Sequence, residues 1–196
     1  MKVERFPAVG PDDERITPLI EKVGKDPQNH YFRVTMACTL SHQDAWRKAL
    51  EDGHERVMIL EDDVRIHRKW KDIVGRQIEE LDGKNESWKA IMVNAARSYL
   101  TWEATFKRAE NDNLTGAYIV TKDGINKMLD RFGTTYTQSD HMTTWLQAND
   151  IVYVYFPWLA VQENYESDIQ GKEHVKGLED WFDKNFWSRY DDLYTQ

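Results

Sequence analysis

The amino-acid sequence predicts an α/β fold in which helices cover a mainly parallel central sheet. Short apolar segments alternate along the chain with segments whose apolar residues recur at helical spacing, as in folds built from strands and crossover helices. The clearest apolar segment, residues 57–60, shows no alternation, which is typical of a strand buried on both faces. Three acids, Glu61, Asp62 and Asp63, follow it directly. Because ligands bind at the carboxyl ends of such strands, these acids mark a candidate site.

Composition narrows the class of protein. The 196 residues suffice for one domain with a sizeable core, and the net charge of −8 argues against nucleic acid as the main partner. The single cysteine, Cys38, excludes an internal disulfide framework. The first ten residues have no apolar core of a signal peptide, and no segment reaches membrane-spanning length. We therefore expect a soluble, cytoplasmic protein with no transmembrane segment.

The first half of the chain predicts a short strand and two helices around the apolar segment. Residues 3–9 read as a strand interrupted by a proline, and residues 37–51 read as a helix that ends before Gly53. His42 lies on the apolar face of that helix, where a hydrogen-bonded core histidine is the default interpretation. Residues 70–81 keep helical spacing, and Gly83 ends this second helix.

The second half predicts further strands and two capped helices. The expected strands are residues 88–93, 114–120 and 151–156, with residues 99–106 ambiguous. Thr121 is expected to cap a helix that ends near Gly133, and Ser139 is expected to cap a helix over residues 140–149. The latter cap would place Asp140 in the first helical turn.

The three acids indicate a divalent-cation site. Carboxylates this close repel one another unless a cation or a ligand offsets their charge. Oxygen ligands suit Mg²⁺ or Mn²⁺, held together with substrate phosphates. On an extended backbone Glu61 and Asp63 point the same way and Asp62 the other way. The simpler interpretation, that Asp62 and Asp63 are solvated or cap the next helix, stays open.

With these positions set out, the sequence resembles glycosyltransferase family 25, the lipooligosaccharide and collagen galactosyltransferase group of GT-A fold. The shared segments are residues 38–42 (CTLSH) followed by Trp46, then 59–63 (ILEDD), 5–8 (RFPA), 116–120 (GAYIV), Asp140 at a helix start, 157–162 and 167–169. The resemblance implies a GT-A-like three-layer sandwich with a mainly parallel, mixed central sheet over residues 1–170. Residues 171–196 are expected to form an aromatic helical extension, packed on the same domain or on a partner subunit.

The resemblance also implies an activity. The expected reaction is an inverting, metal-dependent transfer of a hexose such as galactose or glucose. The donor would be a nucleotide-diphosphate sugar, with a UDP-hexose as the favoured candidate, and the acceptor a hydroxyl of a glycan or glycoprotein. Asp63 would bind Mn²⁺ or Mg²⁺ directly, with Glu61 and His141 as further metal ligands. A cation there stabilises the departing diphosphate. The implied substrate-binding residues are His42, Glu61, Asp62, Gly116, Tyr118 and Gln162.

An inverting transfer needs a base for the acceptor hydroxyl, and Asp140 is the candidate. Its position matches where inverting GT-A enzymes place their base, although it equally fits an ordinary acid at a helix start. Glu163 and Asp168 are the next candidates. His141 can likewise be a hydrogen-bonded structural residue instead of a metal ligand.

One departure from the family concerns the first strand, which in relatives precedes the RFPA segment. Here Met1 lies four residues before Arg5, so we expect that strand to be absent. Residues 178–190 are expected to cover the resulting sheet edge, by folding back or by forming a homodimer. A non-catalytic sugar- or nucleotide-binding relative is the second hypothesis, and a metal-dependent phosphohydrolase is a distant third.

Overall fold

The structure is a computed structural model, which describes residues 3–67, 69–84, 86–94, 105–110, 115–156 and 158–162. The predicted aromatic extension, residues 171–196, and the two alternative bases, Glu163 and Asp168, lie outside the described residues. The helices are α1 (Ile16–Lys22), α2 (His30–Glu51), α3 (Trp70–Gly83), α4 (Lys122–Phe132) and α5 (Ser139–Asn149). The strands are β1 (Arg56–Leu60), β2 (Val64–Ile66), β3 (Ala90–Met92), β4 (Thr105–Arg108), β5 (Ala117–Thr121), β6 (Val152–Phe156) and β7 (Ala160–Gln162).

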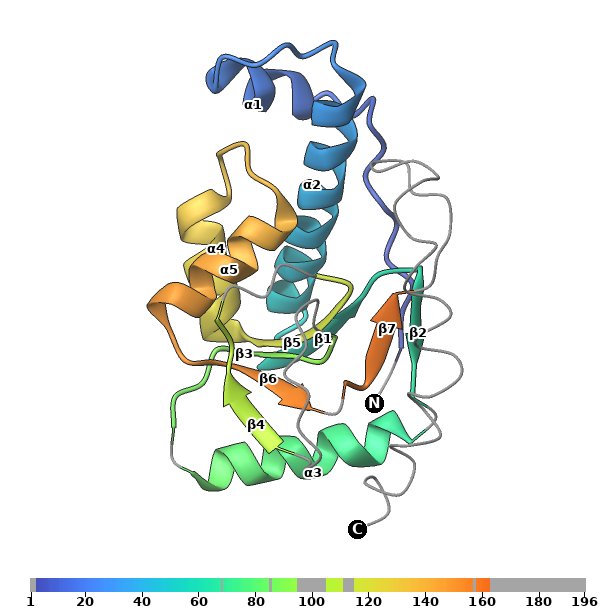
Figure 1. The fold of residues 1–196 in the computed structure, drawn as a ribbon. Coiled ribbons are helices and arrows are strands. Elements are labelled where there is room, and N and C mark those ends of the chain that lie inside the picture. Colours follow the sequence, from blue (N-terminus) through green and yellow to red (C-terminus); the bar gives the residue numbers. More distant parts are fainter. Residues whose placement is uncertain are drawn as a thin grey trace.

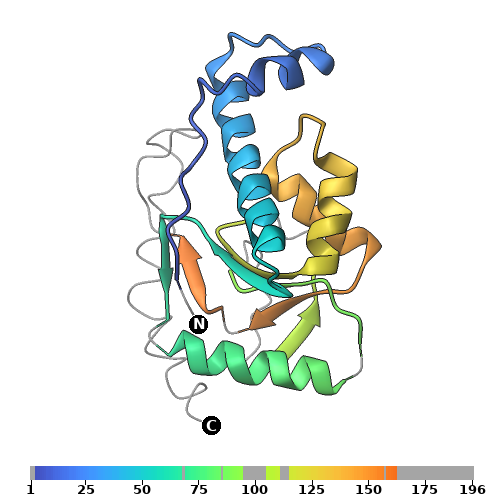
Figure 2. The same ribbon diagram turned by 180° about the vertical axis from the view of Figure 1, so that it is seen from behind.

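The α/β class is confirmed, and the elements form three layers. Helices α2, α4 and α5 lie on one side of the five-stranded sheet, and α3 lies on the other side (Figure 1). Figure 2 shows the same layers from behind. The main core joins the sheet to both helical layers, with Trp46 of α2, Val74 of α3 and Met128 of α4 all fully buried. Among the described helices, none is long and apolar enough to cross a membrane.

The sheet is mixed, as expected, but the prediction that it is mainly parallel is wrong. Among the described strands the order is β1-β5-β3-β6-β4, and only the β3–β6 pair is parallel. Strands β1, β3 and β4 each pair antiparallel with β5 or β6. Neighbouring strands in this sheet are often far apart in the sequence. The apolar run within one strand does not tell whether its neighbour runs parallel or antiparallel to it, and this is why the direction was mispredicted.

Strand β1 is also not central. In the described part of the chain it pairs with β5 alone, from Arg56 opposite Thr121 to Leu60 opposite Ala117. Its residues are half-buried or exposed, and Leu60 retains 38% of its exposure. The unbroken apolar run therefore marks an edge strand in the described sheet, whereas all of β3 and the first four residues of β5 are buried.

Local signals placed the helices better than the sheet. Thr121 caps α4 as expected, because its hydroxyl accepts a hydrogen bond from the Gly124 amide. Helix α2 begins at His30, earlier than predicted, and the Asn29 side chain accepts from the Tyr31 amide. Residues 3–9 form no strand; instead the Val9 amide donates to the Ser41 hydroxyl. Helix α5 begins at Ser139 itself, so Ser139 is not its cap.

Candidate functional site

The carboxylate turn, residues 61–63, joins the end of β1 to β2. The Glu61 amide donates to the Gly116 carbonyl at 2.8 Å, and the Val64 amide donates to the Glu61 carbonyl at 3.4 Å. The turn is therefore fixed to the start of β5. Glu61 and Asp63 are half-buried and Asp62 is exposed, in agreement with the alternation expected of an extended backbone.

Glu61 is held in place by a buried hydrogen-bond network. The His42 Nε2–H donates to Glu61 Oε1 at 3.1 Å, and the Thr115 hydroxyl donates to the same oxygen at 2.9 Å. The other ring nitrogen of His42 is hydrogen-bonded to Tyr118 Oη at 2.9 Å, and Trp46 Nε1–H donates to that oxygen at 2.9 Å. Residues 42 and 46 lie one turn apart on α2, so one helical face supplies both groups.

The network also sets the charge of the site. Burial opposes a charge on the His42 ring, whereas Tyr118, Cys38 and Glu61 favour it, and the net effect raises the pKa of His42 well above its ordinary value. Burial raises the pKa of Tyr118, which stays a neutral phenol. His42 Nε2 and Glu61 Oε1 are close enough to form an ion pair when the ring is protonated, with the histidine 5% and the carboxylate side chain 25% exposed.

Three of the predicted substrate-binding residues have partners within the fold. Tyr118 is fully buried, and its hydroxyl is hydrogen-bonded to His42 and Trp46. His42 is likewise buried and contacts Glu61. Gly116 contributes its carbonyl to the carboxylate turn. Gln162 lies on β7 opposite Val64, and its side chain lies outside the described part of the chain.

The start of α5 is joined to the same network. The Ser139 and Thr115 hydroxyls lie 3.3 Å apart, and the Cys38 Sγ lies 3.6 Å from the Ser139 hydroxyl. Asp140, the next residue, is half-buried in the first turn of α5. Its carbonyl accepts hydrogen bonds from the Thr143 and Thr144 hydroxyls. The candidate base therefore follows directly on a residue that contacts the Glu61 network.

The metal-ligating groups gather differently from the prediction. Among the described residues, Cys38, His42 and Glu61 form the only trio of such side chains, with ligand atoms within 4.8 Å of one another. Both nitrogens of His42 are hydrogen-bonded within the network, so the network itself accounts for this trio. His141 is exposed and lines a pocket beside α5, outside the trio.

Sequence reasoning missed Asn94, which lies two residues after the end of β3. Its side-chain oxygen accepts from the Ala117 amide at 3.1 Å, next to the Gly116 carbonyl that binds Glu61. Asn94 is 2% exposed, and its Nδ2 has no hydrogen-bond partner among the described residues. A polar residue at the end of a predicted buried strand was the available signal.

Several known proteins are similar to this chain in sequence. The sequence matches glycosyltransferase family 25 (LPS biosynthesis protein) over residues 1–143. It is 23% identical to procollagen galactosyltransferase 2 of Mus musculus over 144 residues, which cover 69% of this chain and 22% of that protein. It is 26% identical to lacto-N-neotetraose biosynthesis glycosyltransferase LgtE of Neisseria meningitidis serogroup B over 197 residues, which cover 88% of this chain and 68% of that protein.

A third relative is described as inactive. The inactive glycosyltransferase 25 family member 3 of Homo sapiens is 32% identical over 56 residues, covering 29% of this chain and 9% of that protein. This chain spans about a fifth of the length of procollagen galactosyltransferase 2. The match to the family covers 143 of the 196 residues of this chain. The matched part includes α2, the carboxylate turn and the start of α5. The chain belongs to glycosyltransferase family 25.

Proposed function

We propose that the protein transfers a hexose from a nucleotide-diphosphate sugar, a UDP-hexose, to a hydroxyl of a glycan or glycoprotein. The observation that carries this proposal is the carboxylate turn at the end of β1, which the Glu61–His42 hydrogen bond and Thr115 hold in one geometry. Two of the named relatives are a galactosyltransferase and a lacto-N-neotetraose biosynthesis glycosyltransferase. Family membership and a fixed carboxylate turn together support transfer of a sugar.

Asp63 and Glu61 would hold a divalent cation, Mn²⁺ or Mg²⁺. The fit rests on donor chemistry, because carboxylate oxygens are the ligands that these cations prefer. One oxygen of Glu61 is engaged by His42 and Thr115, so Asp63 is the principal ligand in this proposal. When bound, the cation would stabilise the negative charge of the departing diphosphate.

The remaining roles fall to residues around the turn. Asn94 brings a buried amide donor to the same edge of the sheet, where phosphate or sugar oxygens could accept its hydrogen bonds. Asp140 is proposed as the base that takes the proton of the acceptor hydroxyl, with inversion at the transferred carbon. Its support is its place in the first turn of α5, directly after Ser139.

The second candidate function is binding without turnover, which the inactive human relative makes a specific alternative. A panel of UDP- and GDP-hexoses with Mn²⁺ and glycan acceptors separates the two, with nucleotide release as the readout. Release that depends on the acceptor supports transfer. Tight UDP binding by titration calorimetry with no release from any donor would instead support the binding protein.

The metal proposal is tested by UDP titration with and without Mn²⁺. Asp63→Asn should abolish the tightening of UDP binding by Mn²⁺, because it removes the principal ligand and lies outside the main core. Asp72→Asn is the matched control, since that carboxylate is exposed on α3 and has no role in the proposed site, and it should keep the effect. Equal Mn²⁺-dependent affinity in wild type and Asp63→Asn would remove Asp63 from the site.

A further inference from the structure

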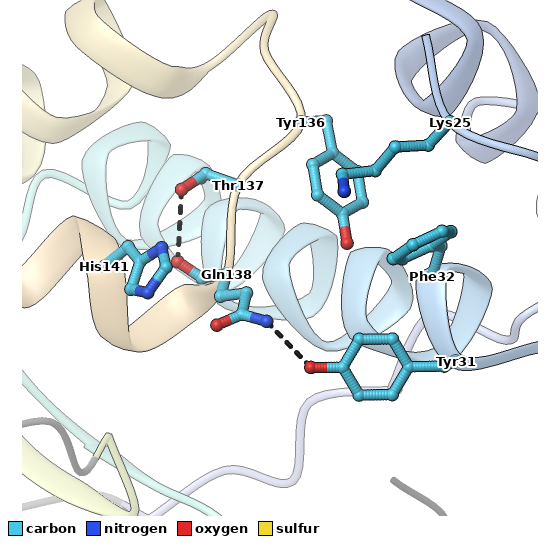
Figure 3. A pocket seen from close by; sticks show the side chains of 7 residues that line it. All are labelled: Lys25, Tyr31, Phe32, Tyr136, Thr137, Gln138 and His141. Carbon is cyan, nitrogen blue, oxygen red and sulfur yellow. Dashed lines mark hydrogen bonds between the residues drawn. The ribbon is translucent and has the colours of Figure 1, made fainter. Parts of the chain in front are cut away.

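An aromatic pocket lies between the start of α2 and the loop before α5, near the Glu61 network (Figure 3). Its volume is ≈ 400 Å³, within the range of pockets that hold small organic ligands. Tyr31 and Phe32 come from α2, and Tyr136 comes from the loop before α5. The Phe32 and Tyr136 rings meet edge to face with centroids 6.1 Å apart, and Tyr31 and Phe32 do so at 5.6 Å.

Polar groups surround these rings. Gln138 Nε2 donates to Tyr31 Oη at 3.0 Å, which fixes both side chains (Figure 3). The Lys25 ammonium lies 4.4 Å from the centre of the Phe32 ring. His141 lines the same pocket and is exposed. The pocket therefore combines flat apolar surfaces with an amide, an ammonium and an imidazole.

The pocket is close to the proposed chemistry but separate from it. Gln138 and His141 line the pocket. Between them lie Ser139, which belongs to the Glu61 network, and Asp140, the proposed base. On α2, Tyr31 precedes Cys38 by seven residues, which is two helical turns or about 10 Å. Cys38 in turn contacts Ser139. The pocket and the Glu61 network are thus separated by about 10 Å along α2, a distance that a short oligosaccharide can span.

We propose that this pocket binds a pyranose ring of the acceptor glycan, one or two sugar residues away from the hydroxyl that receives the hexose. This inference rests on the proposed function and names the acceptor class. Aromatic faces complement the C–H faces of a pyranose, and the surrounding amide, ammonium and imidazole can hydrogen-bond to its hydroxyls. The pocket flanks Asp140, which is on the acceptor side of the reaction, and this proximity favours a glycan over the donor nucleotide as occupant.

Direct binding tests the pocket without turnover. Saturation-transfer NMR on the full chain would use a panel of methyl monosaccharides and disaccharides of glucose, galactose, mannose and N-acetylglucosamine, without donor. At least one disaccharide should bind more tightly than its monosaccharides, because the second ring fills the pocket. UDP with Mn²⁺ should not displace it. Displacement by UDP, or the absence of binding by every glycoside, would overturn the proposal.

Variants then locate the binding site. Tyr31→Ala and Gln138→Ala should each raise the Kd of the bound disaccharide at least fivefold. Tyr31 is 44% exposed, so its removal should leave the fold intact. Phe6→Ala is the matched control, since Phe6 is 37% exposed and outside the pocket lining. Unchanged affinity in both pocket variants would refute this location.

The two proposals fail in distinguishable ways. If no donor is consumed but disaccharide binding depends on Tyr31, the transfer activity is refuted and the sugar pocket stands. If transfer occurs with an acceptor KM that is the same in wild type, Tyr31→Ala and Gln138→Ala, the pocket is refuted and the activity stands.

Discussion

Tyr118→Phe removes one oxygen atom from the centre of the buried network, and its cost can be worked out from the structure. The hydroxyl is hydrogen-bonded to both His42 Nδ1 and Trp46 Nε1, each at 2.9 Å. Trp46 and Tyr118 are fully buried and His42 is 5% exposed, so water cannot replace the lost partner. Each buried group left unpaired costs about 1–3 kcal/mol. The variant should therefore lose about 2–6 kcal/mol of a typical margin of about 5–15 kcal/mol.

Urea unfolding and thermal melting measure this loss. For a chain of this length the expected fall in Tm is roughly 5–20 °C. Tyr153→Phe is the matched control, because the Tyr153 hydroxyl is hydrogen-bonded to the exposed Glu86, and water can solvate that carboxylate. It should cost less than about 1 kcal/mol. A Tyr118→Phe protein as stable as the Tyr153→Phe control would refute the reasoning that the network is dry and rigid.

Two further substitutions test the base and a buried lysine. Asp140→Asn should slow transfer about 10²–10⁴-fold with little change in UDP affinity by calorimetry; transfer at the wild-type rate would place the base elsewhere. Asp123→Asn should cost about 1 kcal/mol at neutral pH, because Lys89, whose side chain is 8% exposed, loses a carboxylate at 2.7 Å and Asp123 itself is largely exposed. The hydrogen bond from Lys89 lowers the pKa of Asp123 below 3.8, so this contribution is complete above that pH and is lost as the pH falls through the folded-state pKa. Urea unfolding at pH 7 and pH 3 measures this contribution. A difference in unfolding free energy between wild type and Asp123→Asn that does not shrink at pH 3 would contradict the assignment.

The sequence predicted local elements well because their signals are local. Thr121 caps α4 and Gly83 is the last residue of α3, as capping and helix-ending preferences indicate. The strand at residues 56–60 was also recognised. Its position at an edge was not, because pairing partners are set by contacts between distant residues. β1 pairs with β5 across 60 residues of chain, and no periodicity within β1 encodes that choice.

The sequence indicates the acids of the candidate site but not the side chains that hold them in place. A run of three acids after an apolar segment is visible in one dimension. By contrast, Thr115 and Ser139 are far from Glu61 in the sequence. The fold brings the Thr115 hydroxyl to Glu61 and the Ser139 hydroxyl, at the start of α5, to Thr115. His42 was left open between a core histidine and a ligand-binding residue, and it is a core residue that contacts the acid from within. Asn94 carried no motif, and it is identified only by its burial and by an Nδ2 that has no hydrogen-bond partner within the described part of the chain.

The charge arrangement explains why adjacent acids at one turn need not act alike. The His42 ring and the Thr115 hydroxyl both hydrogen-bond to one oxygen of Glu61, so the fold itself stabilises this carboxylate. Asp62 is exposed, and water screens its charge. Asp63 is half-buried beside both. In the proposed function a cation bound at the turn would offset the negative charge of Asp63, while Glu61, with one oxygen engaged by His42 and Thr115, would serve mainly to keep the turn in place.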